Sequence, residues 1–201
     1  MPPLNPNRIP RVFTEEEINL LATSSEELEK RTAVMSFDID QLVSRLKGEP
    51  WQQMLQGHLY FDHVITLLLT EELKNPNAID VKRMGFAQKL QLVHAIGLIP
   101  DDMAPVATVV NKIRNGLAHD LEAKIGHKEI GWLKNALPKA LKKEASEDEG
   151  NEEHWIRAVL VYSLVALDSV RQRNALQRLQ QRKAYLNAAR VLDQADLRYV
   201  P

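Results

Sequence analysis

Apolar residues recur at helical spacing through most of this 201-residue chain, and they almost never alternate as they do in a β-strand. Long segments consist of Leu, Ala, Glu, Lys, Gln and Arg, which are good helix formers, and only 8 glycines interrupt them. Hydrophobic residues make up 44% and charged residues 26%, the balance of a folded globular protein. The sequence therefore predicts an all-α protein, an antiparallel helical bundle with extra N-terminal helices and a long C-terminal helix.

Capping signals, glycines and prolines predict where the helices begin and end. Thr14 and Glu17 have capping-box spacing and start a short helix, and the pattern at Ser24 starts a longer one that we expect to continue to Gly48. Apolar residues share one face of that longer helix: Leu28, Met35, Ile39, Leu42 and Leu46. Further helices are expected over 51–73, over 86–97, around 106–117 and over 128–143, the last one kinked or split at Pro138.

Composition divides the chain into four parts. Residues 1–13 contain prolines at positions 2, 3, 6 and 10 and predict a flexible arm, and residues 14–145 predict the helical bundle. Residues 146–153 predict an acidic loop, because five of the seven residues from 147 to 153 are acids. Residues 154–201 predict a C-terminal helical region that packs on the bundle.

Composition also excludes several kinds of site. The chain has no cysteine, so it has no disulfide, thiol nucleophile or cysteine-bound metal. Its 26 basic and 27 acidic residues argue against tight, non-specific binding of polyanions. The longest apolar stretch, residues 155–170, contains two charged residues and is too short to cross a bilayer, and residues 1–6 lack the pattern of a secretory signal. We expect a cytoplasmic protein with no membrane partner.

The segment from Asn111 to Asp120 carries the strongest candidate for a functional site. On a helix Asn115 and His119 share a face, whereas Arg114 and His119 diverge by about 140°. Gly116 could loosen the turn and let Arg114 approach His119. An arginine fork binds phosphate and a histidine transfers protons near neutral pH, so the set suits phosphate chemistry. A purely structural alternative is a histidine that favours the helix C-terminus and an arginine paired with an acid.

The hexapeptide from Arg114 to His119 resembles the Arg–(Asn/Asp/His)–three residues–His signature of the HEPN superfamily of helical RNases. Its surroundings agree: residues 57–64 resemble the early helix of that family, and residues 89–100 resemble the segment that leads into the motif helix. The resemblance covers roughly residues 51–124.

The resemblance implies a helical bundle that dimerises through the motif helices, so that two Arg–His pairs line one cleft. It implies metal-independent endoribonuclease activity of a toxin or defence effector, with no cofactor, in which the RNA 2′-hydroxyl attacks the adjacent phosphorus. His119 would be the acid/base residue, Arg114 the phosphate clamp, and Asn115 would orient the histidine or the substrate. The expected partners are a second copy of the chain, RNA, and an antitoxin or regulatory protein.

A second candidate surface is the segment 171–190, which has a net charge of +6 with no acid, against −7 for the rest of the chain. Five of its residues are candidate RNA contacts: Arg171, Arg173, Arg178, Arg182 and Lys183. The alternative is a face that is solvated or docks on acidic parts of the chain. Arg173 and Asn174 copy the start of the motif, but Arg178 stands where the histidine belongs, so this copy should be inert.

Other histidines and the tryptophans give weaker signals. His58, Asp62 and His63 resemble part of a metal site but lack a third ligand at a recognisable spacing, so exposed or supporting roles are favoured. Trp51, Trp132 and Trp155 are better explained as core or interface anchors than as base-stacking platforms, since aromatic residues make up only 5%. The alternative function is therefore a non-catalytic helical binding or regulatory module, resembling the mannitol-operon repressor type, that acts through protein contacts.

Overall fold

The computed structural model describes residues 12–119, 122–146 and 152–197, and within these ranges it contains helices and no strand. The all-α prediction is thus confirmed for the described chain. Contacts divide the protein into two units, residues 35–174 and residues 1–34 with 175–201. The predicted arm lies outside the described residues up to position 11, and so does the acidic loop over 147–151.

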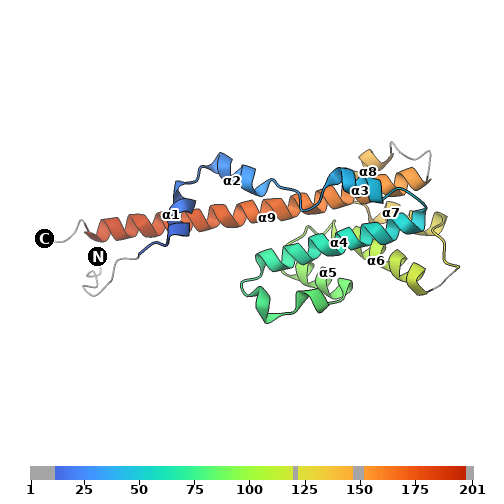
Figure 1. Cartoon of the computed structure of the whole chain (residues 1–201), viewed down its shortest axis with the longest axis horizontal. Helices are drawn as coiled ribbons and strands as arrows, with labels where there is room; N and C mark the ends of the chain where they lie inside the picture. Colours follow the sequence, from blue (N-terminus) through green and yellow to red (C-terminus); the bar gives the residue numbers. More distant parts are fainter. Residues whose placement is uncertain (1–11, 120–121, 147–151, 198–201) are drawn as a thin grey trace. The chain divides into compact units, whose positions relative to one another are not determined.

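The unit of residues 35–174 contains most of the helices (Figure 1). Its α-helices are α3 (Ile39–Arg45), α4 (Pro50–Glu72), α5 (Phe86–Ala95), α6 (Ala104–His119), α7 (His127–Ala136), α8 (Lys139–Ser146) and the first part of α9 (Glu152–Leu197). Two 3₁₀ turns, η1 (Pro76–Ala78) and η2 (Val81–Arg83), connect α4 to α5. Pro50 occupies the first turn of α4. Gly97 follows α5 with a φ of 73°, as the sequence predicted for the end of this helix.

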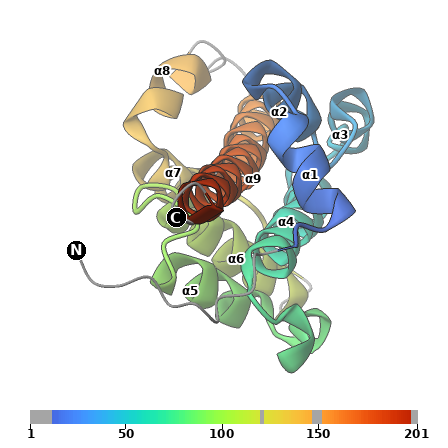
Figure 2. The ribbon, with the colours of Figure 1, turned by 90° about the vertical axis from the view of Figure 1, so that its left-hand side faces the viewer.

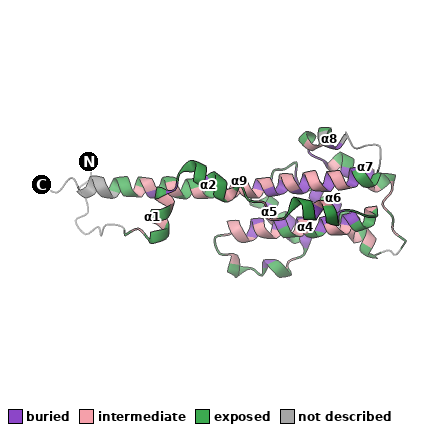
Figure 3. Cartoon of the chain, turned by 45° about the horizontal axis from the view of Figure 1, so that its top comes forward, coloured by how far each residue is buried: buried purple, intermediate pink, exposed green. Residues whose placement is uncertain are grey.

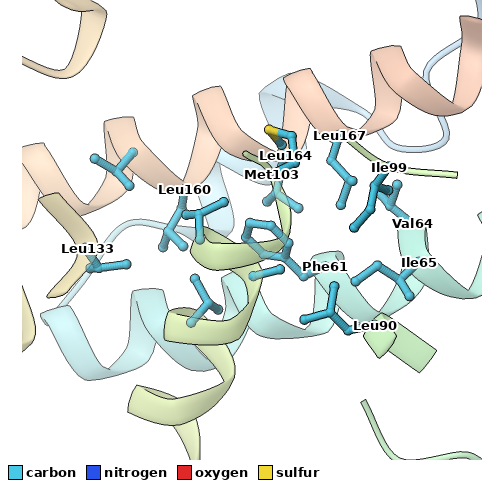
Figure 4. Close-up of a cluster of buried hydrophobic side chains, with 14 of the residues drawn as sticks. Phe61, Val64, Ile65, Leu90, Ile99, Met103, Leu133, Leu160, Leu164 and Leu167 are labelled. Atoms are coloured by element: carbon cyan, nitrogen blue, oxygen red, sulfur yellow. The ribbon is translucent and has the colours of Figure 1, made fainter. Parts of the chain in front are cut away.

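The core of this unit is a continuous cluster of aliphatic side chains around Phe61 of α4 (Figure 4). The side chains of Val64, Leu160 and Leu164 have no exposed surface. Other members come from α5, α6 and α7 and from the loop before α6: Leu90, Val106, Val110, Leu133, Ile99 and Met103. Figure 3 shows the buried residues along α4, α6 and the first part of α9. The core therefore fixes α6, which carries the Arg114 motif.

α4 and the first part of α9 pack closely and run in the same direction (Figures 1 and 2). Gly57 of α4 faces Leu160, and Glu71 at the other end of α4 pairs with Arg171 of α9. These contacts make this pair parallel, whereas the sequence predicted an antiparallel bundle. The long connection from α5 to α8 brings the chain back to the end of the unit where α4 begins, and α9 starts there. Helical periodicity does not predict the path of such a connection.

Gly57 allows the close approach of these two helices. A Cβ atom at this position would lie 2.9 Å from Leu160 Cδ2 and 3.0 Å from Cδ1, and Leu160 is itself fully buried. We expect Gly57→Val to lower the free energy of unfolding by about 2 kcal/mol, because an overpacked core must shift. Gly131→Val in α7 is the matched control, since a Cβ there meets nothing within 4 Å. Equal denaturation midpoints for the two variants would contradict this account.

The predicted helix from Ser24 to Gly48 is divided into α2 (Ser25–Thr32) and α3. The interruption has a tertiary cause. The backbone N–H and the hydroxyl of Ser36 donate to the buried carboxylate of Asp168 in α9, at 3.2 and 2.6 Å. Asp38 then caps α3 by accepting from the N–H of Gln41. A continuous helix would use the Ser36 N–H within itself, so periodicity alone overestimated the length of the element.

The other unit contains α1 (Glu15–Ala22), α2 and the part of α9 from residue 175. Thr14 and Glu17 form the predicted capping box. Residues 12–34 carry six acids and two bases, and they face the basic segment of α9: Arg182 pairs with Glu17, and Lys183 donates to the carbonyl of Thr23. Leu28 and Leu186 are buried in this unit.

Candidate functional site

α6 carries the predicted motif on one unbroken helix, from Ala104 to His119. Asn111, Asn115 and His119 follow one another at four-residue intervals and so form a row along one edge of the helix. Buried Val106, Val110 and Ile113 hold the opposite side of α6 in the core. Along this edge Asn111 and Asn115 are half-buried and His119 is exposed, so the polar row reaches solvent at the end of α6.

Arg114 lies beside this row and is half-buried. Its Nη1 donates to Asn115 Oδ1 at 3.1 Å, so the guanidinium and the amide are held together. His119 is exposed at the last residue of α6. The helix is regular across Gly116, so within one chain Arg114 and His119 keep the divergence of about 140° expected of residues five apart. The structure joins Arg114 to Asn115, and shows no loosened turn at Gly116.

A histidine that the sequence placed in a supporting or exposed role is buried against this motif. His58 of α4 is 8% exposed, its ring lies 4.5 Å from that of Phe86, and its Nε2 is 3.1 Å from Asn111 Oδ1. Burial lowers the pKa of His58, and the nearby charge of Arg114 lowers it further, against the opposing effect of the Asn111 hydrogen bond. His58 is therefore neutral at pH 7 and donates its Nε2–H to Asn111.

An ion pair extends this polar cluster one turn further along α4. The ammonium of Lys89 in α5 is buried, and its three donors are all used: 2.9 Å to each oxygen of Asp62 and 3.0 Å to Thr66 Oγ1. Asp62 is about one-third exposed. The cluster of His58, Asp62, Lys89 and Asn111 thus joins α4, α5 and α6 behind the motif.

The two partners of this ion pair should respond unequally to mutation. Asp62→Ala leaves the Lys89 charge buried with one hydroxyl partner, and we expect a loss of about 2–3 kcal/mol in the free energy of unfolding. Lys89→Met leaves a carboxylate that can reach water, so a loss of under about 1 kcal/mol is expected. Urea denaturation of both variants measures the difference. A larger loss for Lys89→Met would refute the asymmetry.

The spacing of this cluster was visible in the sequence. His58, Asp62 and Thr66 recur every four residues, which makes a polar row along one face of α4. Lys89 and Asn111 could not be assigned to it, because no local pattern says which helix packs on that row. Among the described residues, no group of three or more His, Cys, Asp or Glu side chains could hold a metal ion.

A pocket of about 210 Å³ adjoins the motif on the His119 flank of α6. Its lining includes Lys112 and Gly116 of α6, Lys124 of the following loop and Trp132 of α7. Lys112 and His119 are seven residues apart and lie within about 20° of each other around the helix. The Lys112 ammonium lies 3.7 Å from the centre of the Trp132 ring. The lining also includes the acid Glu129, and Lys112 lies two helical turns before His119, so this flank of α6 carries both cations and an acid.

The five predicted RNA contacts in α9 are placed differently from one another. Arg171 is 12% exposed and pairs with Asp168 and Glu71, so it holds helices together and these ion pairs argue against a role in RNA binding. Arg182 and Lys183 dock on residues 12–34, as the alternative interpretation of this segment expected. Arg173 and Arg178 are exposed. In the inert copy of the motif, Asn174 donates to the Leu98 carbonyl at 2.8 Å.

Comparisons with known proteins identified no relative of this chain. A scan of family models, a search of curated proteins and a search of solved structures each found no match to this chain. Among the helices of the described chain, none has an apolar stretch long enough to cross a bilayer.

Proposed function

We propose that this protein is a metal-independent endoribonuclease of HEPN type, of the kind that acts as a toxin or defence effector. The observation that carries the proposal is the accessible edge of α6, where Arg114 is bonded to Asn115 and His119 ends the same row of polar residues. An arginine fork, an amide and an imidazole are sufficient for phosphate transfer within RNA.

The polar cluster behind α6 supports this assignment. Neutral His58 holds Asn111, and the charge of Arg114 is close enough to lower the pKa of His58. Arg114 is itself half-buried and donates to Asn115 Oδ1 at 3.1 Å, so it is held in place rather than being a free surface cation. A fixed donor contributes more to catalysis than a mobile one because it needs no reorganisation during the reaction.

In the proposed reaction His119 accepts the proton of the 2′-hydroxyl while that oxygen bonds to phosphorus. The bond from phosphorus to the 5′-oxygen breaks, and this oxygen leaves with a proton, so the products are a 2′,3′-cyclic phosphate and a 5′-hydroxyl end. Arg114 binds the phosphate oxygens and stabilises the charge that builds on them. A homodimer through the α6 helices would supply a second, protonated His119 for the leaving oxygen.

The proposal is tested by incubating the purified protein with RNA in excess chelator, beside His119→Ala. Cleavage by the wild-type protein alone is expected, and a 2′-deoxy residue at the cut site should block it. If both proteins cut equally, or neither cuts, the proposal fails. An antitoxin or regulatory protein would be sought as a partner that inhibits the wild-type cleavage.

The alternative is a non-catalytic regulatory module that resembles the mannitol-operon repressor type. It is favoured by Glu17 of α1, which pairs with Arg182 in the basic segment of α9 and so reduces the positive surface available to RNA. Tight binding of a partner protein that survives the double variant Arg114→Ala/His119→Ala would favour this alternative.

A further inference from the structure

We propose that a second pocket, at the junction of α3 and α4, binds a nucleotide, with the base stacked on Trp51 and the phosphate held by Arg45 and Lys47. This pocket, which we call the Trp51 pocket, has a volume of about 350 Å³ and is lined by Arg45, Lys47, Trp51, Gln52, Leu55 and Gln56. Its volume lies within the range of about 300–1,000 Å³ that is typical of small-molecule sites. It shares no lining residue with the motif on α6, so the proposal does not depend on RNA cleavage.

Trp51 is the first indication of a ligand. Its side chain is 47% exposed, whereas Trp155 is 3% exposed and lies in the core. Of the two alternatives predicted for the tryptophans, the core therefore applies to Trp155 and not to Trp51. An exposed indole at the wall of a pocket offers a flat face on which a base can stack.

The charges of the lining select the kind of ligand. Arg45 ends α3 and Lys47 follows it, and both are exposed. Within the described chain neither makes an ion pair, and no acid lines the pocket. A cationic ligand is disfavoured, and an anion can bind the arginine fork together with the lysine ammonium. Two cationic side chains beside an indole are thus suited to a ligand in which an anionic group is attached to a planar ring.

The two glutamines can recognise the edge of such a ring. Trp51, Gln52, Leu55 and Gln56 lie on one face of the first turns of α4. Gln52 Oε1 accepts from the N–H of Glu49 at 3.1 Å, which fixes the side chain while leaving its amide N–H groups for a ligand. A glutamine amide offers both a donor and an acceptor to a base edge.

The turn that brings the cations to Trp51 is fixed in shape. Gly48 has a φ of 118°, a conformation that glycine adopts easily, and this reverses the chain between Lys47 and α4. The buried amide of Gln53 donates to the Gly48 carbonyl at 2.8 Å. The Trp51 pocket is therefore formed before any ligand arrives, which lowers the entropy cost of binding.

A free mononucleotide and one nucleotide of an RNA strand present the same base and phosphate. The two sources are separated by titrating the full-length protein with AMP and with a 2′-O-methyl adenosine hexanucleotide, and by following tryptophan fluorescence or heat. Neither probe can be cut by attack of a 2′-hydroxyl. Binding of AMP would assign the pocket to free nucleotides, and binding of the hexanucleotide alone would assign it to a strand. Binding of neither probe would overturn the proposal.

Variants locate the binding. Trp51→Ala is expected to raise the Kd about tenfold, because stacking of a base on an aromatic ring is lost, whereas Trp51→Phe should keep it within about threefold. Arg45→Ala/Lys47→Ala should raise the Kd about tenfold or more through the loss of phosphate contacts. The control Lys74→Ala/Lys82→Ala removes the same charge from exposed positions of this unit and should leave the Kd unchanged. An unchanged Kd in the Arg45/Lys47 variant with native far-UV circular dichroism would also overturn the proposal.

Discussion

Replacement of His119 by alanine is expected to lower the rate of RNA cleavage by about 10²–10⁴-fold, the usual contribution of a general acid or base. His119 is exposed at the end of α6, so the variant should keep the stability of the wild-type protein. A single-turnover rate with a fluorescent RNA, measured beside a thermal unfolding curve, separates the loss of chemistry from the loss of fold. His94→Ala is the matched control, since His94 is also exposed and its imidazole Nε2 contacts the fully exposed Asp101 at 2.9 Å.

Substitutions of Arg114 test the same site independently. Arg114→Ala should reduce the rate by about 10²–10³-fold, as expected for the removal of one donor to a developing oxyanion. Arg114→Lys keeps the charge but loses the fork and the geometry of the bond to Asn115, so it should recover only part of the rate. The double variant with His119→Ala should lose less than the two single effects combined, because the residues act on one step. Full activity of Arg114→Ala would refute its role as phosphate clamp.

Asp168→Ala is expected to lower the free energy of unfolding by about 3–5 kcal/mol. The carboxylate has no exposed surface, and it accepts from the Ser36 hydroxyl at 2.6 Å, from Arg171 Nε at 2.8 Å and from Gln172 Nε2 at 3.0 Å. Its removal leaves these partly buried donors without the acceptor that they share. Arg171 keeps Glu71, which prevents a still larger loss.

The pair Asp80–Arg83 is the matched control for Asp168–Arg171. Both pairs join an aspartate to an arginine three residues later, but the side chains of Asp80 and Arg83 are 57% and 89% exposed. Asp80→Ala should cost at most about 1 kcal/mol, because water and salt screen the exposed pair. Chemical denaturation of both variants tests the difference, and similar losses would show that burial of the Asp168 network is not what stabilises the fold.

The Asp168 network also predicts the pH dependence of stability. Burial by itself would raise the pKa of Asp168, but the hydrogen bonds from Arg171, Ser36 and Gln172 and the charge of Arg171 outweigh it and hold the pKa below the ordinary value of 3.8. A lowered pKa means that the contribution is complete above about pH 3.8 and is lost as the pH falls through the folded-state pKa. The stability difference between wild type and Asp168→Asn should therefore shrink in acid.

Local signals identified many of the elements. The capping box at Thr14, the end of α5 before Gly97 and the division of α7 from α8 at Pro138 agree with the structure. These features depend on residues within one turn of each other, so the sequence contains all the information that they need. The motif was predictable for the same reason, because Asn115 and His119 lie one turn apart on a single helix and therefore share an edge.

Contacts between distant segments were decided only by the tertiary structure. His58 and Asn111 are 53 positions apart, and Ser36 and Asp168 are 132 apart. These contacts bury His58, for which the local pattern allowed either an exposed or a supporting role, and divide one predicted helix into α2 and α3. Contacts with Asp168 and Glu71 likewise place Arg171, a candidate RNA contact, in an internal ion pair. The helical periodicity of the sequence by itself determined the all-α class and the polar edge of α6. The packing of α4, α6 and α9 decided which polar side chains lie buried together, because burial and pairing depend on which faces meet.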